Sequence, residues 1–190
     1  MTEVSINKQA KLSEHLASPS EAALSHLSEL NGLRLSPHFS LGEMTKTSAK
    51  GLDNTPPHGA VMNLKNLCEN WLEDLRYSYN TLYCLEPGED YETSKNVEPI
   101  MINSGFRSEE VNKAIGGVKG SNHLTGCAVD IRVAGIEQLL RYAVILLDIA
   151  DGNKRDFDEL LLERSPKGTY WLHFAVRPSG NRRKVRLIQT

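Results

Sequence analysis

Apolar residues recur at helical spacing in two long stretches of the chain. In residues 60–76 they form one stripe with the charged residues mainly off it, a pattern that predicts an amphipathic helix. The members of this stripe are Val61, Leu64, Leu67, Cys68, Trp71, Leu72 and Leu75. Residues 135–150 predict a second long helix. Shorter helices are predicted over residues 20–30 and 108–115, each behind a serine cap.

Four short apolar stretches predict strands, over residues 97–103, 128–133, 157–163 and 170–176. The last two flank the segment Ser-Pro-Lys-Gly-Thr, which indicates a hairpin. Strands that alternate with helices and close on a hairpin imply an α+β fold with a mainly antiparallel sheet packed with helices. A chain of 190 residues is long enough for one domain with a real core. We expect residues 31–190 to form that domain and residues 1–30 to be an N-terminal arm with a short helix.

Three residues of metal-binding types stand at or beside these strands. His123 precedes the second strand by a turn of small residues, Asp130 lies within that strand, and His173 lies within the last one. Two imidazoles and one carboxylate leave a tetrahedral Zn²⁺ with one position for water, which is typical of a catalytic site. The sequence therefore predicts one Zn²⁺ per chain, held by His123, Asp130 and His173.

Three ordered sequence blocks surround these residues. They are Ser-Gly-Phe-Arg-Ser at residues 104–108, Ser-x-His-x-x-Gly-x-Ala-x-Asp at residues 121–130, and Trp-x-His at residues 171–173. In this order they resemble the zinc peptidases of the M15 family, which include D-Ala-D-Ala carboxypeptidases and phage L-alanyl-D-glutamate endopeptidases. Residues 36–44 are similar to a phage and gut-bacterial branch of that family, and the resemblance runs from about residue 33 to about residue 183.

The resemblance implies the fold shared by DD-peptidases and hedgehog signalling domains. It also implies a metallopeptidase, a carboxypeptidase or an endolysin, that acts on the stem peptides of bacterial peptidoglycan. The bond that is cut, carboxy-terminal D-Ala-D-Ala or internal L-Ala-D-Glu, does not follow from these residues.

The general base is the least direct assignment. Many relatives place a carboxylate three residues before the last histidine, where this chain has Tyr170, and a phenol is no base near neutral pH. If residues 166–170 form a five-residue hairpin loop, Glu163 lies directly opposite His173 and points to the metal side. Hedgehog-like relatives also carry a glutamate on the preceding strand. We therefore predict Glu163 as the general base. Glu159 is the runner-up for this role, and the alternative for Glu163 is a surface residue in a salt bridge.

Three further residues are expected around the substrate. The resemblance implies that Arg107 binds the substrate carboxylate or stabilises the developing oxyanion, and a guanidinium fork suits both roles. The alternative for Arg107 is to hold the loop that follows it. Ser121 is expected to order the loop around His123, and Ser121 and Trp171 are predicted to line the substrate site.

Composition excludes several classes of partner. The net charge is −2, so no overall positive field favours nucleic acid. Residues 182–186 are a short basic segment that either contacts anionic wall polymer or is a solvated edge.

No stretch reaches the ~18 apolar residues of a membrane span. The N-terminus lacks the features of a secretory signal. We therefore expect a monomer made in the cytoplasm, which reaches the cell wall after release as phage lysins do.

The cysteines and the acidic loop predict no further chemistry. The three cysteines, Cys68, Cys84 and Cys127, are odd in number and widely spaced, so no disulfide is expected and Cys127 is interpreted as a core residue. Residues 85–96 are acidic and rich in turns but lack the spacing of a calcium loop, which predicts a surface loop. Two other functions stay open: a zinc-binding module without catalysis, and a phage virion or assembly protein with this fold.

Overall fold

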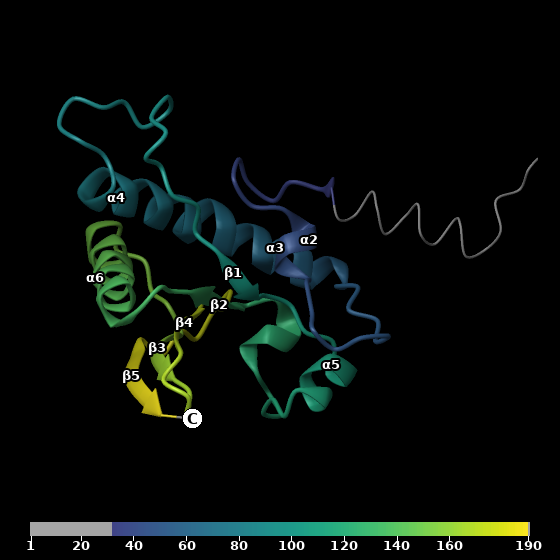
Figure 1. The fold of residues 1–190 in the computed structure, drawn as a ribbon. Coiled ribbons are helices and arrows are strands. Elements are labelled where there is room, and N and C mark those ends of the chain that lie inside the picture. Colours follow the sequence, from purple (N-terminus) through teal and green to yellow (C-terminus); the bar gives the residue numbers. More distant parts are fainter. Residues whose placement is uncertain (1–31, 190) are drawn as a thin grey trace, which may run out of the picture.

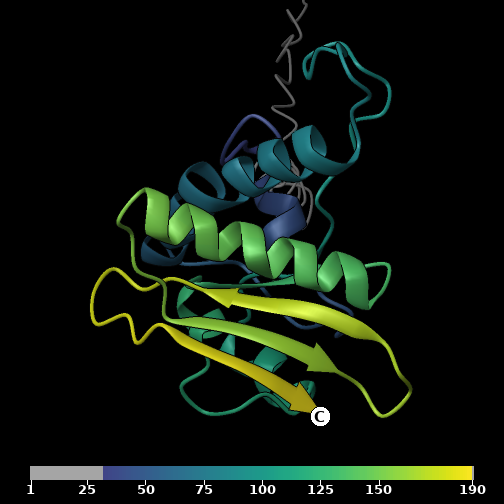
Figure 2. The same cartoon turned by 90° about the vertical axis from the view of Figure 1, so that its left-hand side faces the viewer.

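A five-stranded sheet covered by helices forms the described part of the chain, residues 32–189 of a computed structural model (Figure 1). The arm and helix predicted over residues 1–30 lie outside these residues. The strands are β1 (Ile102–Ser104), β2 (Ala128–Arg132), β3 (Glu159–Arg164), β4 (Tyr170–Ala175) and β5 (Lys184–Gln189), in the order β1-β2-β4-β3-β5. All neighbouring pairs are antiparallel except β3 and β5, whose arrows point the same way in Figure 2. The predicted α+β class with a mainly antiparallel sheet is confirmed.

The longest helical segment is continuous over three elements. It comprises α3 (His58–Leu67), a π-helical turn η1 (Cys68–Leu72) and α4 (Glu73–Tyr83), which run in one line in Figure 1. The predicted end at residue 76 was therefore wrong by about two turns. The helix continues because Tyr79 and Asn80 extend its buried side, and the Asn80 side chain donates to the backbone oxygen of Glu98 at 3.0 Å.

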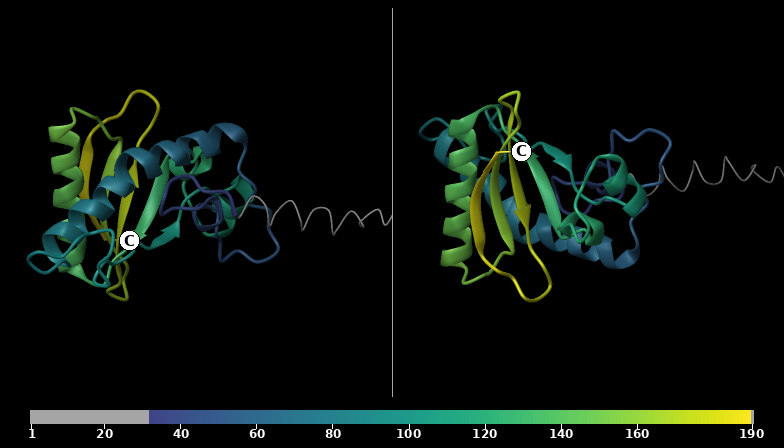
Figure 3. Two further views of the ribbon diagram at one scale, coloured as in Figure 1. Left: turned by 90° about the horizontal axis from the view of Figure 1, so that it is seen from above. Right: turned by 90° about the horizontal axis from the view of Figure 1, so that it is seen from below.

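The remaining helices are α2 (Leu41–Met44), α5 (Glu109–Ala114), the 3₁₀ turn η2 (Asn122–Thr125) and α6 (Ile136–Gly152). Helix α6 packs on β3, β4 and α4. Views from above and below place α6 beside the C-terminal strands and α5 toward the β1 edge (Figure 3). No helix within residues 32–189 combines the length and apolarity that crossing a membrane requires.

One face of the sheet forms the core. Its helix-facing side chains are all buried or half-buried: Val129, Ile131, Leu160, Leu162, Leu172 and Phe174. Trp71 of η1 packs against them, with its ring centroid 5.1 Å from that of Phe174. Because side chains alternate along a strand, the residues between these apolar ones project to the opposite face, which we call the outer face. The outer face carries Asp130 and His173.

The hairpin between β3 and β4 has a different register from the one predicted. The backbone N–H of Ser165 donates to the oxygen of Thr169 at 2.9 Å, and Gly168 closes the turn with a φ of +85° that suits glycine. Leu161 consequently lies opposite His173, and Glu163 lies opposite Trp171. The predicted loop position, residues 166–170, and the direct Glu163–His173 pairing were both wrong: the strands are joined by residues 165–169. The error is two residues, so Glu163 still projects to the outer face.

The basic segment at residues 182–186 leads into a strand that was not predicted. It contributes to β5, which pairs with β3 at the edge of the sheet. Charged residues alternate with apolar ones in this segment, and the charges are typical of a solvated edge as well as of an edge strand. Arg182 and Lys184 bind carboxylates of the chain itself, Asp158 and Glu159, rather than standing free in solvent.

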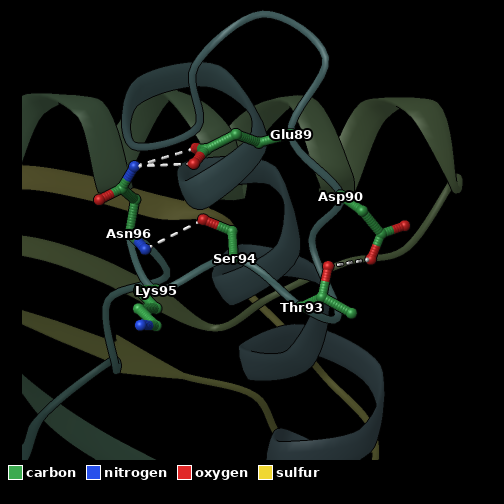
Figure 4. Close-up of a pocket in the computed structure, with 6 residues that line it drawn as sticks. All are labelled: Glu89, Asp90, Thr93, Ser94, Lys95 and Asn96. Carbon is green, nitrogen blue, oxygen red and sulfur yellow. Dashed lines mark hydrogen bonds between the residues drawn. The ribbon is translucent and has the colours of Figure 1, made fainter.

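The acidic residues 85–96 form a turn-rich surface loop, as predicted. Its carboxylates accept hydrogen bonds from the loop's own donors: Asn96 donates to both oxygens of Glu89 at 3.0 Å, and Thr93 donates to Asp90 (Figure 4). They are therefore not gathered around one point. All three cysteines are free, and Cys68 and Cys127 are buried. The absence of disulfides agrees with the prediction.

Candidate metal centre

Three side chains from two strands and one turn meet at the outer face of the sheet. His123 Nε2 lies 3.2 Å from Asp130 Oδ1 and 3.2 Å from His173 Nδ1, and the last two atoms are 2.9 Å apart. All three side chains are buried. Ligand atoms about 2.0–2.1 Å from a tetrahedral zinc lie about 3.3 Å from one another, so this triangle has nearly the required size. Among the residues the structure describes, this is the one cluster of histidine, cysteine and acidic side chains that fits a metal.

The strand register brings two of the candidate ligands together. Asp130 of β2 and His173 of β4 are direct partners across the antiparallel pair. Cross-strand partners have Cβ atoms about 5 Å apart, which lets both side chains reach a common point. Ala128 and Ala175, also direct partners, lie next to them on the same face and occupy little volume.

The third candidate ligand, His123, is held by the capped turn η2. The Ser121 hydroxyl accepts a hydrogen bond from the His123 N–H at 3.3 Å, as expected for a residue that orders this loop. Gly126 ends the turn with a φ of +69°, and a Cβ there would lie 2.4 Å from the backbone oxygen of Ala60. The spacing of serine, histidine and glycine in the motif therefore describes one tight turn pressed against α3.

Each imidazole has an acceptor near the nitrogen that faces away from the centre. His123 Nδ1 donates to the backbone oxygen of Gly105 at 2.6 Å, and His173 Nε2 lies 3.6 Å from Glu159 Oε2. Metal-binding histidines usually donate their other N–H to a carbonyl or carboxylate, which fixes the tautomer and the ring orientation. Both histidines are thus arranged as ligands, with one nitrogen of each left for a metal.

Arg107 is part of this assembly. Its Nη2 bonds to Asp130 Oδ2, and its Nε donates to the Ser104 hydroxyl at 2.8 Å. Arg107 therefore orients the carboxylate ligand. Its other terminal nitrogen, Nη1, has no hydrogen bond to any of residues 32–189.

A second polar network lies behind the histidines, and sequence reasoning missed most of it. Asn122, next to His123, donates to Asp158 at 2.8 Å and to Glu159 at 3.2 Å. Lys184 and Arg182 lie 2.8 and 3.0 Å from the other oxygen of Glu159. The network joins the turn that carries His123 to the strands beside His173. The one signal for this network in the sequence is the basic segment of residues 182–186, because clustered positive charges are stabilised by acidic partners.

The two glutamates of β3 have different surroundings. Glu159 is held by Asn122, Arg182 and Lys184, whereas Glu163 is half-buried and makes no hydrogen bond or ion pair within residues 32–189. The direct partner of Glu163 is Trp171, two residues before His173 on β4, so Glu163 is a diagonal neighbour of His173 on the outer face. A half-buried carboxylate without a partner is a frequent mark of a functional site.

The pKa values of these groups follow from their contacts. Burial disfavours the charged form of Asp130, but His123, followed by His173, outweighs it and lowers the pKa of Asp130. Burial also disfavours charged His173, but the neighbouring Asp130 and Glu159 carboxylates outweigh it and raise the pKa of His173 to about 9. Burial lowers the pKa of His123 and raises that of Glu163. The hydrogen bond to His173, followed by Lys184, lowers the pKa of Glu159. Glu163 is therefore the carboxylate of β3 whose pKa moves toward neutrality.

Comparison with known proteins agrees with this geometry. The family model described as Peptidase M15 matches residues 37–146, more than half of the chain, and includes His123 and Asp130. The chain belongs to the peptidase M15 family. No curated protein matches the chain. Membership of this family makes the chain a peptidase by class.

Proposed function

We propose that this chain is a zinc-dependent peptidase that hydrolyses peptide bonds in the stem peptides of bacterial peptidoglycan. The observation that carries the zinc assignment is the triangle of His123 Nε2, Asp130 Oδ1 and His173 Nδ1, with edges of 2.9–3.2 Å. The acceptors behind both imidazoles support it, since they orient the two rings as ligands. The choice of peptidoglycan rests on the resemblance of the three sequence blocks to wall-cleaving members of the family.

When bound, zinc would supply a Lewis acid and lower the pKa of a water molecule to about 7. The remaining chemistry belongs to side chains of the chain. Glu163 is proposed to take a proton from the attacking water and to pass it to the leaving amine. Its place on the outer face and its raised pKa support this role, because a base works best with a pKa near the working pH.

Arg107 and Trp171 are proposed to act on the substrate. Arg107 is anchored through Nε and Nη2, so its free Nη1 is the atom available to a developing oxyanion. Trp171 is half-buried and shares the outer face with His173, where its ring offers an apolar surface to a peptide. Ser121 is proposed to lie near the substrate while its hydroxyl orders the turn around His123.

Digestion of purified peptidoglycan, followed by mass spectrometry of the released fragments, tests the proposal. Loss of a terminal D-alanine identifies a carboxypeptidase, and cleavage between L-alanine and D-glutamate identifies an endopeptidase. Metal analysis of protein purified without added metal should find near one zinc per chain. Bound zinc with no product from several wall chemistries would contradict the proposed activity and favour a silent zinc-binding module.

A further inference from the structure

Arg132 is an arginine without a partner next to the candidate metal centre. It is the last residue of β2, two positions beyond Asp130, and side chains two positions apart project to the same face. Its direct partner on β4 is Trp171, which in turn lies opposite Glu163. Arg132 is exposed, and its guanidinium makes no hydrogen bond or ion pair within residues 32–189. A free cationic group therefore shares the outer face with Asp130 and Glu163.

Arg107, the other arginine near the centre, is differently placed. Two of its three guanidinium nitrogens bind Ser104 and Asp130, and the Asp130 carboxylate already balances its charge. A second carboxylate beside this pair would be repelled by Asp130 and would compete with it for the same donors. Arg132 has no such competitor, and a guanidinium binds a carboxylate through two parallel hydrogen bonds. An incoming carboxylate is thus better matched to Arg132.

Arg132 also borders a cavity at the end of the sheet. Arg132 lines a cavity of about 470 Å³ together with Met101, Val133 and Tyr142. Glu98 lines the same cavity but forms no ion pair with Arg132 in the described part of the chain. Because Tyr142 belongs to α6, this cavity lies toward the helix side of the sheet, and on the outer face the exposed side chain of Arg132 is open to solvent.

We infer that Arg132 binds a carboxylate of the substrate that lies within about two residues of the cleaved bond. The inference rests on the proposed function, because it takes the cleaved bond to lie at the three-ligand cluster. The Cα atoms of Asp130 and Arg132 are two strand positions, about 6.6 Å, apart, and an extended peptide advances about 3.4 Å per residue. Arg132 is then a specificity-determining residue, and the substrate class is a peptide that carries a negative charge close to the cleaved bond.

Two carboxylates of a stem peptide meet this description. One is the C-terminal carboxylate, and the other is the free carboxylate of the D-glutamate residue. Two pairs of synthetic stem peptides separate them: one pair ends in a carboxylate or an amide, and the other carries D-glutamate or its amidated form. We expect the wild-type protein to prefer the charged member of one pair.

The test measures kcat/KM for the four peptides with the wild-type protein and with Arg132→Gln, Arg132→Lys and Arg186→Gln. Arg132→Gln should lower kcat/KM for the preferred charged peptide by about 10- to 100-fold, mainly through KM, because one charge-assisted contact is lost. It should hardly change the amidated peptide. Arg132→Lys should keep part of the preference. Arg186 is a matched control, since it is exposed, projects to the outer face and has no partner among the described residues, but lies on the edge strand β5.

A preference that survives in Arg132→Gln, or that Arg186→Gln weakens equally, overturns the inference. A wild-type protein that cleaves both members of each pair equally overturns it too. Cleavage of none of the four peptides contradicts the proposed function instead. In that case calorimetric binding of the same peptides to the wild-type protein and to Arg132→Gln still tests the arginine: equal affinities reject its role, and a loss of 10-fold or more supports it.

Discussion

Replacement of Glu163 by glutamine should remove most turnover while zinc and fold are retained. Glu163 makes no hydrogen bond or ion pair within residues 32–189, so its substitution breaks no contact in the described structure. Loss of a general base typically costs about 10²–10⁴ in rate. The matched control is Glu159→Gln, on the same strand and the same face.

Glu159→Gln should weaken zinc binding rather than the chemical step. This residue lies 3.6 Å from His173 Nε2 and is held by Lys184 at 2.8 Å, so its charge and position depend on the network behind the metal site. Loss of a partner that orients a metal ligand typically weakens metal binding about 10- to 100-fold. We therefore expect Glu159→Gln to lose zinc to a chelator more readily, and to recover much of its activity when zinc is added.

The pH dependence gives a second signature of Glu163. Burial raises its pKa, so the carboxylate must lose its proton at a higher pH than an ordinary glutamate before it can act as a base. The wild-type kcat/KM should fall on the acid side as the pH drops through this raised pKa. Since folding favours the protonated form of such a group, Glu163→Gln should keep or slightly raise the melting temperature at neutral pH.

The assay combines three measurements on each variant: kcat/KM against pH, zinc dissociation by chelator competition, and thermal unfolding. Glu163→Gln with near-normal turnover would refute its assignment as the base. Loss of zinc in Glu163→Gln would show that the carboxylate supports the metal instead. If Glu159→Gln keeps its zinc affinity but loses 10²-fold or more in rate, Glu159 is the base and the two roles are exchanged.

Other residues allow sharp tests of the site and its supports. His173→Ala should lose stoichiometric zinc by elemental analysis, and full metal content would reject it as a ligand. Gly126→Ala should lower the free energy of unfolding, measured by chemical denaturation, by at least about 2 kcal/mol, because the new Cβ combines a left-handed backbone with a close contact to Ala60. Gly120→Ala is its control: it has the same backbone strain, but no atom lies within 4 Å of the new Cβ. Asp158 is buried, which raises its pKa, but hydrogen bonds from Arg182 and other polar neighbours outweigh burial and lower it. Asp158→Asn should therefore lower the free energy of unfolding by about 2–3 kcal/mol at pH 7. This difference should shrink as the pH falls from the ordinary aspartate range, where the unfolded chain gains the proton first, toward the lowered pKa of the folded carboxylate. An equal loss at pH 3 and pH 7 would contradict the linkage.

The strongly periodic segments were predictable because burial imposes a local pattern on the sequence. The apolar stripe of residues 60–76 and the apolar core strands could be recognised without knowledge of their partners. The three proposed metal ligands could also be named, since imidazole and carboxylate groups in ordered motif blocks have a restricted chemistry. The structure then brings His123, Asp130 and His173 within hydrogen-bonding distance of one another.

Register and distant pairing were not predictable in the same way. The predicted Glu163–His173 pairing was wrong because the position of the turn depends on the backbone angles of Gly168, which the periodicity of the strands does not report. Strand β5 was missed because its partner β3 lies more than 20 residues earlier in the chain and its charges balance carboxylates there.

The sequence alone therefore determined the fold class, the core and the identity of the candidate ligands, since these depend on side-chain type and local spacing. Only the tertiary structure decided which carboxylate of β3 supports His173 and which stands without a partner. It also decided that Arg107 is occupied while Arg132 is free. These roles arise from contacts between segments far apart in the chain, and such contacts leave no periodic trace in either segment by itself.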